Sequence, residues 1–408
     1  MVTGRSSEGL QYALKRSEGS AVGYCSLSIK CGTRDENGFP EGLAHFTEHT
    51  IFKGTSKRTS SAINSYLDKL GGELNAYTTK EEIVIHATVL KEDLPKAAGL
   101  LFELATMATF PEKEIELEKN VVIDEIASCK DVPSDDIYDR FETLLFEGHP
   151  LSRMILGTKS SVQKISRQNL VDFTKRNFIA SNMAFSAVAD EDEGKLEKLA
   201  LKLSREYFDD CPEVPQRALE RPQVNVFDKR INKHTHQVCA ILGGLAPSLY
   251  DEKERIATIL LCNILGGPAT NSILNNVLRE KHGWVYGVEC SFTQYADTGI
   301  VTISLGCDKE NLEKCLVAIG KEIEKLQSAP LSPTRLKAYK RQLLGQLAIS
   351  SDNGEAQCLS MGKSLLSYSC VKSSEENIKQ IMDVTAEQIQ SLACRLFAKD
   401  QLSSLIYY

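Results

Sequence analysis

The stretch Gly42-Leu-Ala-His-Phe-Thr-Glu-His-Thr-Ile-Phe-Lys-Gly54 sets two imidazoles and one carboxylate on one surface of a predicted helix. His45 and His49 are four residues apart, or about 40° around a helix axis, and Glu48 lies about 60° to the other side of His45. All three side chains can therefore face one small volume. Two neutral imidazoles at this spacing suit Zn²⁺, at Zn–N distances of about 2.0–2.1 Å. The intervening carboxylate then lies close enough to take a proton from water on the metal.

The alternative interpretation is that the two histidines only pack on an amphipathic helix. The sequence has seven His in 408 residues, and chance gives the five-residue pattern in about one chain in a hundred of such composition. Because a zinc site takes at least three protein ligands, a third candidate ligand decides between the two interpretations.

The segment 112–127 is a strong helix former that carries two candidate carboxylates. Its apolar residues recur on one face, while Glu118 and Glu125 are seven residues apart, about 20° off a common line. Glu125 can serve as the third ligand, and Glu118 can orient a ligand. The alternative is that both carboxylates lie on a solvated helix face, which is usual for helical glutamates.

Three blocks of the sequence together resemble the insulinase/pitrilysin family of zinc peptidases, which includes the mitochondrial processing peptidases. The blocks are Cys31-Gly-Thr-Arg-Asp-Glu36, the stretch from Gly42 to Thr55, and Gly71-Gly-Glu-Leu-Asn-Ala-Tyr-Thr78. The His-x-x-Glu-His order is the inverzincin pattern, the reverse of the commoner zinc-binding order. The resemblance covers the whole chain. It implies that His45, His49 and Glu125 hold one Zn²⁺ per chain, with Glu48 as general base and Glu118 as a supporting carboxylate.

Length and composition predict a globular protein of two domains. At 408 residues the chain is longer than one ordinary core, with 42% hydrophobic and 25% charged residues. It has no run of about 18 apolar residues, so we expect no membrane span. A net charge of −7 argues against nucleic-acid binding, which needs a concentrated basic face. The sequence shows no signal core and no Cys-x-x-Cys pair among twelve cysteines, so we expect a cytoplasmic protein with reduced thiols.

A proline-containing, charged segment at 211–222 predicts a linker between a zinc-binding domain, 1–210, and a second domain, 223–408. The second domain repeats the first, since the pattern at 84–94 recurs at 301–312, followed in each copy by an apolar helix. We expect an α+β fold of two homologous domains, each a mostly antiparallel sheet with helices packed on one face.

The first strands are expected at Tyr12–Lys15 and Ala21–Ile29, as an antiparallel pair joined by a turn.

The second copy of the repeat, in the later domain, lacks the metal ligands. An apolar segment, 257–265, replaces the histidine helix, and Gln346 stands opposite Glu125. One half therefore binds the metal, and the other half serves another purpose.

A candidate for that purpose is the corner between a helix that ends at Gly283 and the strand that follows it. Arg279 and Tyr286 flank this corner, and both can donate hydrogen bonds to the oxyanion formed when a peptide carbonyl is attacked. The alternative is a salt-bridged arginine at a helix end beside an aromatic residue at a strand start. In the resembled family, an Arg and a Tyr seven residues apart in the later domain act on the oxyanion, and this pair matches.

The sequence predicts a strand at residues 73–78, beside the metal helix. The family resemblance makes this strand the edge that pairs with an extended substrate, so Asn75, Ala76 and Tyr77 are the predicted substrate-binding residues. Main-chain pairing gives little sequence specificity but requires an unfolded backbone. The expected substrates are therefore unstructured peptides.

The resemblance also bears on assembly, because the largest relatives carry four such units that enclose the substrate and this chain carries two. A closed chamber then needs two chains, and we expect a homodimer in which Arg279 and Tyr286 act either within their own chain or on the zinc site of the partner. The function expected is that of a zinc-dependent metalloendopeptidase. The alternative is a non-catalytic or partner-dependent subunit of a processing-peptidase-like complex.

Overall fold

The computed structural model describes residues 1–209, 217 and 219–408. The described residues form two compact units, neither of which is a single run of the chain. The first comprises Met1–Ala127, Arg153–Ala218 and Ile349–Lys372, and the second comprises Ser128–Ser152, Leu219–Ala348 and Ser373–Tyr408. This division differs from the single boundary expected at 211–222, because Ser128–Ser152 belongs to the second unit and Ile349–Lys372 belongs to the first. Within that expected linker, residues 211–216 and 218 lie outside the described part of the chain.

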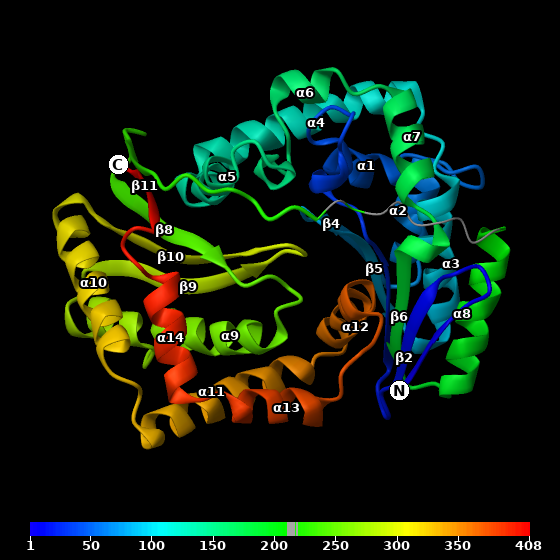
Figure 1. Cartoon of the computed structure of the whole chain (residues 1–408). Coiled ribbons are helices and arrows are strands. Elements are labelled where there is room, and N and C mark those ends of the chain that lie inside the picture. The colour runs from blue at the N-terminus through cyan, green and yellow to red at the C-terminus, as the bar shows by residue number, and fades with distance from the viewer. Residues whose placement is uncertain (210–216, 218) are drawn as a thin grey trace. The chain divides into compact units, whose positions relative to one another are not determined.

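The first unit is built on a six-stranded sheet with the strand order β1-β2-β6-β3-β5-β4 (Figure 1). The pair formed by β2 and β6 is parallel, and the other pairs are antiparallel. The strands are β1 (Val2–Arg5), β2 (Gln11–Arg16), β3 (Val22–Ile29), β4 (Glu73–Thr78), β5 (Ile83–Leu90) and β6 (Met183–Ala189).

Strand β6 separates two strands that the sequence predicts as neighbours. The segments Tyr12–Lys15 and Ala21–Ile29 do form β2 and β3, but β6 pairs with both of them, so the predicted antiparallel pair is wrong. All seven residues of β6 are buried, and a strand buried on both faces lies in the interior of a sheet. The inserted strand comes from more than 150 residues later in the sequence, which local patterns do not reveal.

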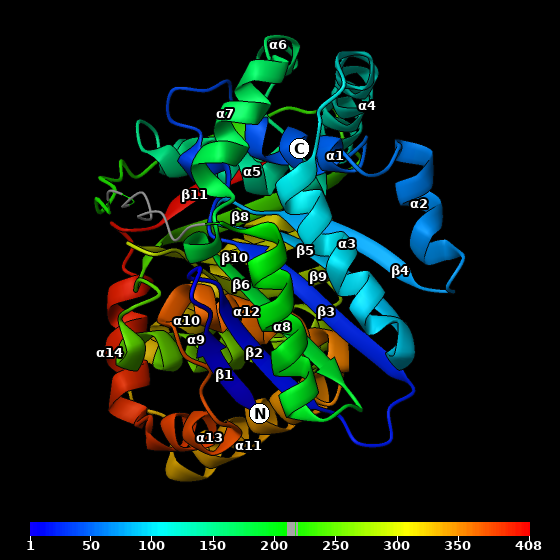
Figure 2. The same ribbon diagram turned by 90° about the vertical axis from the view of Figure 1, so that its right-hand side faces the viewer.

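Alternate residues of these strands face two layers of helices. Leu27, Ile85 and Phe185 belong to a core that includes residues of α3 and α8, which lie across the strands in Figure 2. The opposite face packs through Ala184 and Val188 against α12, a helix from the second half of the sequence. The helices of this unit are α1 (Leu43–Ile51), α2 (Ser60–Asp68), α3 (Leu94–Met107), α4 (Glu112–Asp131), α6 (Lys159–Gln163), α7 (Arg167–Asn177), α8 (Glu193–Tyr207) and α12 (Gly354–Tyr368).

The second unit has the same plan around a five-stranded sheet, with the order β7-β11-β8-β10-β9. One face packs against α9, α10 and α14, and the other face packs against α5, a helix from the first half. The strands are β7 (Asp228–Ile231), β8 (Gln237–Ala246), β9 (Val285–Gln294), β10 (Gly299–Asp308) and β11 (Ser403–Tyr407). The helices are α5 (Pro133–Leu145), α9 (Glu252–Gly266), a π-helical segment (Asn275–Lys281), α10 (Leu312–Ser328), α11 (Pro333–Ser351), α13 (Ser374–Asp383) and α14 (Ala386–Leu396).

The predicted fold class is confirmed, since both units are α+β with mostly antiparallel sheets and a main layer of helices on one face. The repeated pattern folds alike in both: β5 leads through a 3₁₀ turn at Lys91–Asp93 into α3, and β10 leads through one at Lys309–Asn311 into α10. Each unit also has a helix from the other half of the sequence on the second face of its sheet, which is α12 in the first unit and α5 in the second.

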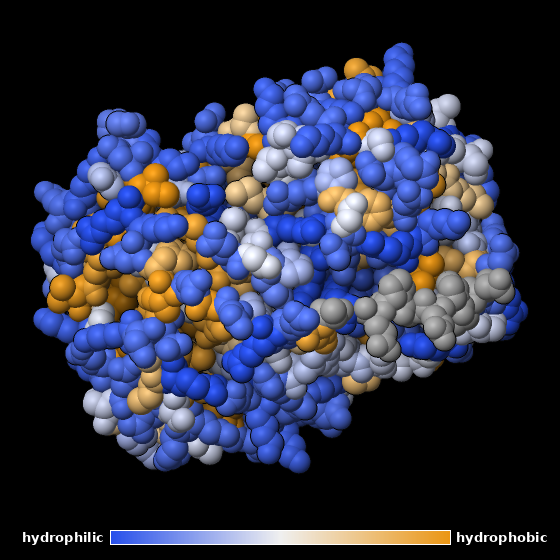
Figure 3. Space-filling model, turned by 45° about the horizontal axis from the view of Figure 1, so that its top comes forward, coloured by the Kyte–Doolittle hydropathy of each residue, from blue (hydrophilic) through white to orange (hydrophobic). Residues whose placement is uncertain are grey.

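Hydrophilic residues cover most of the face drawn in Figure 3, and its largest hydrophobic patch lies over the second unit.

Each helix in the described part of the chain is too short or too polar to cross a lipid bilayer.

Candidate metal centre

The site lies wholly in the first unit, where α1 and α4 present their polar residues to each other. Helix α1 buries Leu43, Phe46 and Ile51 in the core, which fixes the side of the helix on which His45 and His49 stand. Helix α4 packs through Ile115, Val122 and Ile126. Because the helical repeat brings every seventh residue back to nearly the same side, Glu118 and Glu125 both face α1. The local patterns therefore build the site that the sequence predicts.

His45, His49 and Glu125 come together with one ligand atom each, all within 4.8 Å of one another. The Nε2 atom of His45 is 3.8 Å from Glu125 Oε1, and the Nε2 atom of His49 is 3.5 Å from Glu125 Oε2. Ligands bound at about 2.1 Å to a tetrahedral Zn²⁺ lie about 3.4 Å from one another. The three donors, two imidazole nitrogens and one carboxylate, are of the types that zinc binds, and the two distances to Glu125 lie near this spacing.

The two histidines differ in their electrostatic surroundings. Burial, with a smaller effect of the neighbouring His49, lowers the pKa of His45 to about 3. Burial also acts to lower the pKa of His49, but the hydrogen bond to Glu118 and the charges of Glu48, Glu125 and Glu118 outweigh it, so this pKa is raised. His45 is thus already in the neutral form that binds metal, whereas His49 holds a proton more strongly.

Glu118, the predicted supporting carboxylate, contacts both His49 and Lys53. Its Oε1 atom is 2.9 Å from His49 Nδ1, and its Oε2 atom is 2.7 Å from Lys53 Nζ. Burial alone would raise the pKa of Glu118, but its hydrogen bonds to His49 and Lys53 lower it. An ionised carboxylate can only accept hydrogen bonds, so Nδ1 of His49 is the donor and its Nε2 is free to bind a metal.

Glu48 precedes His49 on α1 and is not part of the cluster of His45, His49 and Glu125. Thr78 Oγ1, at the end of β4, donates a hydrogen bond of 2.7 Å to Glu48 Oε2. Burial raises the pKa of Glu48, and the bond from Thr78 opposes that shift. A carboxylate whose pKa is moved toward neutrality is suited to take up and release a proton at the operating pH.

The predicted substrate-binding residues Asn75, Ala76 and Tyr77 lie on β4, which is the edge strand of the six-stranded sheet. One side of β4 pairs with β5, through Asn75 opposite His86 and Ala76 opposite Ile85. The other side has no strand partner among the described strands. Burial raises the pKa of Tyr77, which keeps its hydroxyl protonated.

Arg279 and Tyr286 belong to the second unit. Arg279 lies in the π-helical segment, and Tyr286 lies on β9, on the two sides of Gly283, which has φ +61°. Tyr286 is 56% exposed, and its hydroxyl donates a 2.8 Å hydrogen bond to Asp308. This bond raises the pKa of the Tyr286 hydroxyl. The two residues thus flank a tight helix-to-strand corner, as the sequence predicts, and their role remains a prediction.

In the second unit, an amide pair stands where the repeat would place metal ligands. The repeat of Leu94 at Leu312 corresponds to a shift of 218 residues, which puts Asn263 at the position of His45. Asn263 Nδ2 donates a 2.8 Å hydrogen bond to Gln346 Oε1, the residue predicted opposite Glu125. The Oδ1 atom of Asn263 is buried without a hydrogen-bond partner among the described residues, and this amide pair offers no imidazole or carboxylate to a metal.

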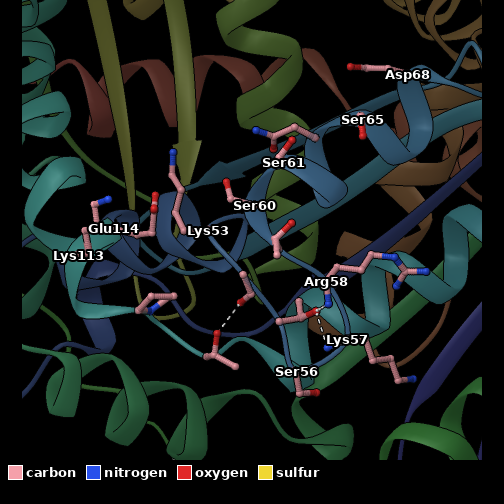
Figure 4. Close-up of a pocket in the computed structure, with 16 residues that line it drawn as sticks. Lys53, Ser56, Lys57, Arg58, Ser60, Ser61, Ser65, Asp68, Lys113 and Glu114 are labelled. Carbon is pink, nitrogen blue, oxygen red and sulfur yellow. Dashed lines mark hydrogen bonds between the residues drawn. The ribbon is translucent and has the colours of Figure 1, made fainter.

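A hydrophilic groove of about 1030 Å³ begins at Lys53 and runs over α2 (Figure 4). Its labelled residues are Lys53, Ser56, Lys57, Arg58, Ser60, Ser61, Ser65, Asp68, Lys113 and Glu114. Several of its cations already have acidic partners, since Lys53 pairs with Glu118 and Arg58 pairs with Glu103. The groove includes none of the predicted ligands or substrate-binding residues.

Three residues of the site were not singled out from the sequence: Lys53, Thr78 and Glu36. Lys53 and Thr78 fall inside the quoted blocks, but their spacing from the ligands gives no periodic signal. Their roles depend on α4 and β4 lying next to α1, which only the folded chain shows.

The fold and the cluster of His45, His49 and Glu125 define a two-unit α+β protein with a candidate metal centre in its first unit. The chain belongs to the insulinase family, because residues 11–159 match the family described as Insulinase (Peptidase family M16) and residues 164–343 match the Peptidase M16 inactive domain. The missing ligands at Asn263 and Gln346 agree with the description of that second domain as inactive.

Relatives of similar length carry zinc-protease names. The chain is 29% identical over 381 residues to an uncharacterized zinc protease of Rickettsia bellii, covering 93% of this chain and 91% of that one. It has the same identity and coverage with an uncharacterized zinc protease of Bacillus subtilis. A crystal structure of a peptidase M16 inactive domain from Pseudomonas fluorescens superposes with a TM-score of 0.91 at 21% identity, covering 100% of this chain and 97% of that chain. The last likeness establishes the fold.

Proposed function

We propose that this protein is a zinc-dependent metalloendopeptidase that hydrolyses peptides in extended, unstructured form. The observation that carries the proposal is the cluster of His45, His49 and Glu125, with Glu48 next to it on α1. These three residues would hold one Zn²⁺. When bound there, zinc supplies Lewis acidity, which polarises a carbonyl group and lowers the pKa of water.

Each residue of the site then has its own role in hydrolysis. Glu48 takes the proton of the attacking water and later delivers it to the leaving amine. The hydrogen bond from Thr78 holds one oxygen of Glu48 and fixes the plane of the carboxylate, so that the other oxygen can face the substrate. Glu118 keeps His49 in the tautomer that binds through Nε2. Arg279 and Tyr286 donate hydrogen bonds to the oxyanion of the transition state.

The substrate binds by adding a strand to β4. The free edge of β4 ends at Thr78, the residue that contacts Glu48, so a peptide paired with Asn75, Ala76 and Tyr77 is led toward the proposed base. We propose a homodimer that encloses this peptide, and a cytoplasmic location. The eleven cysteines in the described part of the chain are all free, which suits a reducing compartment.

The test is metal analysis of the purified protein together with digestion of a mixed peptide library. We expect about one zinc per chain, cleavage that stops with a chelator, and recovery when zinc is added back. A protein that binds zinc but cuts no peptide alone would favour the alternative function, a subunit that needs a partner chain. A protein that binds no zinc would contradict the proposal.

A further inference from the structure

The first turn of α1 is capped by a side chain from outside the helix. Glu36 is fully buried and follows a 3₁₀ turn at Thr33–Asp35. Its Oε2 atom accepts the N–H of Gly42 at 3.1 Å, and its Oε1 atom accepts the N–H of Ala44 at 2.7 Å. A helix leaves its first N–H groups without partners inside the helix. Glu36 therefore satisfies two such groups at the start of the metal helix.

The position of Gly42 explains why the cap comes from elsewhere in the chain. Gly42 precedes the helix at φ +87°, and a Cβ atom there would lie 2.7 Å from the backbone oxygen of Leu156 and 3.0 Å from Cα of Gly157. The residue before the helix must accordingly be glycine, which has no side-chain oxygen. The usual cap by the residue at this position is excluded, and Glu36 takes its place.

The two histidines depend on different supports. His49, in the last turn of α1, is oriented by Glu118. His45 is the third residue of α1, and its Nδ1 atom is buried without a hydrogen-bond partner among the described residues. The place of the His45 imidazole is thus set by its backbone, which means by the first turn of the helix.

We propose that Glu36 is a positioning residue of the metal centre, which holds the first turn of α1 and thereby sets the place of the His45 imidazole. This inference rests on the proposed zinc site. Burial raises the pKa of Glu36 to about 8 against the opposing effect of its two N–H donors. The cap does not require the charge, because each oxygen of a carboxyl group keeps a lone pair in either protonation state. Arg153 Nη1 is 3.9 Å away, too far for a hydrogen bond.

The test compares zinc dissociation constants of the full chain, measured by competition with a chelator. Glu36→Gln replaces one acceptor with an NH₂ group that faces an N–H, and Glu36→Ala removes both acceptors. We expect about 10-fold weaker zinc binding for Glu36→Gln and at least as large a loss for Glu36→Ala, as for other residues that support metal ligands. The visible spectrum of the Co²⁺-substituted protein should change in parallel, because it reports ligand geometry.

The control is Asp192→Asn in the same unit. Asp192 caps α8 by accepting the N–H of Lys195 at 3.2 Å, so this variant makes the same carboxylate-to-amide change at a helix that carries no ligand. Its zinc affinity should stay within about twofold of the wild type, since it touches no ligand support. Equal affinities for the wild type and Glu36→Gln would overturn the inference and leave the proposed function standing. A wild type that binds no zinc would overturn both.

Hydrogen exchange of the metal-free wild type tests the cap without any variant, should Glu36→Gln fail to fold. The amides of Gly42 and Ala44 should exchange as slowly as those of Thr47 and Thr50 in the middle and end of α1. Fast exchange at Gly42 and Ala44, with protection later in the helix, would show that Glu36 does not hold the first turn and would overturn the inference.

Discussion

Zinc binding should displace one proton, and not two, between about pH 5 and pH 6.5. Burial holds the pKa of His45 near 3, so this residue is neutral throughout that range. The pKa of His49 is raised above its ordinary value, so His49 is protonated there and must lose its proton to bind. Because the proton competes with the metal only at His49, affinity is full above the pKa of His49 and falls as the pH drops below it.

The size of the effect follows from this count. One displaced proton changes the dissociation constant tenfold per pH unit, or about 1.4 kcal/mol. Lowering the pH by about 1.5 units should therefore weaken zinc binding about 30-fold, whereas two displaced protons would weaken it about 1000-fold. The two cases differ enough for a competition assay to separate them.

The assay is a chelator competition at several pH values, corrected for protonation of the chelator. It is done with the wild type and with Glu48→Gln, because this variant removes any proton held by the buried Glu48 but also removes a charge that raises the pKa of His49. Replacing Glu118 with Ala removes the hydrogen bond that raises the pKa of His49, so the pH dependence should move to lower pH. A slope of two protons in Glu48→Gln, or no slope at all in the wild type, would refute the assignment of the two histidines.

Two further predictions concern substrate form and assembly. Because β4 offers main-chain pairing, the protein should cut short unstructured peptides and spare stable folded domains, and efficient cleavage at buried bonds of a folded protein would contradict this. If Arg279 and Tyr286 act on the zinc site of a partner chain, mixing inactive Glu48→Gln and Tyr286→Phe proteins under conditions of subunit exchange should restore roughly a quarter of wild-type activity, since half of the dimers then hold one intact site. No recovery despite demonstrated exchange would place all groups of a site in one chain.

The ligand cluster was predictable because helical spacing fixes it almost completely. His45 and His49 share a face of α1, and Glu118 and Glu125 share a face of α4, so only the meeting of the two helices had to be supplied. The family resemblance supplied that meeting, and the structure brings His45, His49 and Glu125 together. The corner at Gly283 was likewise visible as a local helix-stop signal.

What the sequence did not reveal depends on contacts between distant segments. The insertion of β6 between β2 and β3 needs residues 183–189, and the packing of α12 on the first sheet needs a helix from the far half of the chain. Thr78 makes one hydrogen bond to Glu48, and Glu36 accepts two from the start of α1, and such contacts leave no periodic pattern. The cluster of candidate ligands could therefore be predicted from local patterns, whereas the order of the strands in the sheet could not.

The most direct test of the zinc-peptidase account compares Glu48→Gln with His45→Ala for both zinc content and peptide turnover. Glu48 is assigned as the base and not as a ligand, so Glu48→Gln should keep about one zinc per chain and lose roughly 10²-fold or more in turnover. His45→Ala should lose both zinc and activity. Peptidase activity retained in Glu48→Gln would contradict the mechanism, and loss of zinc from Glu48→Gln would contradict the assignment of the ligands.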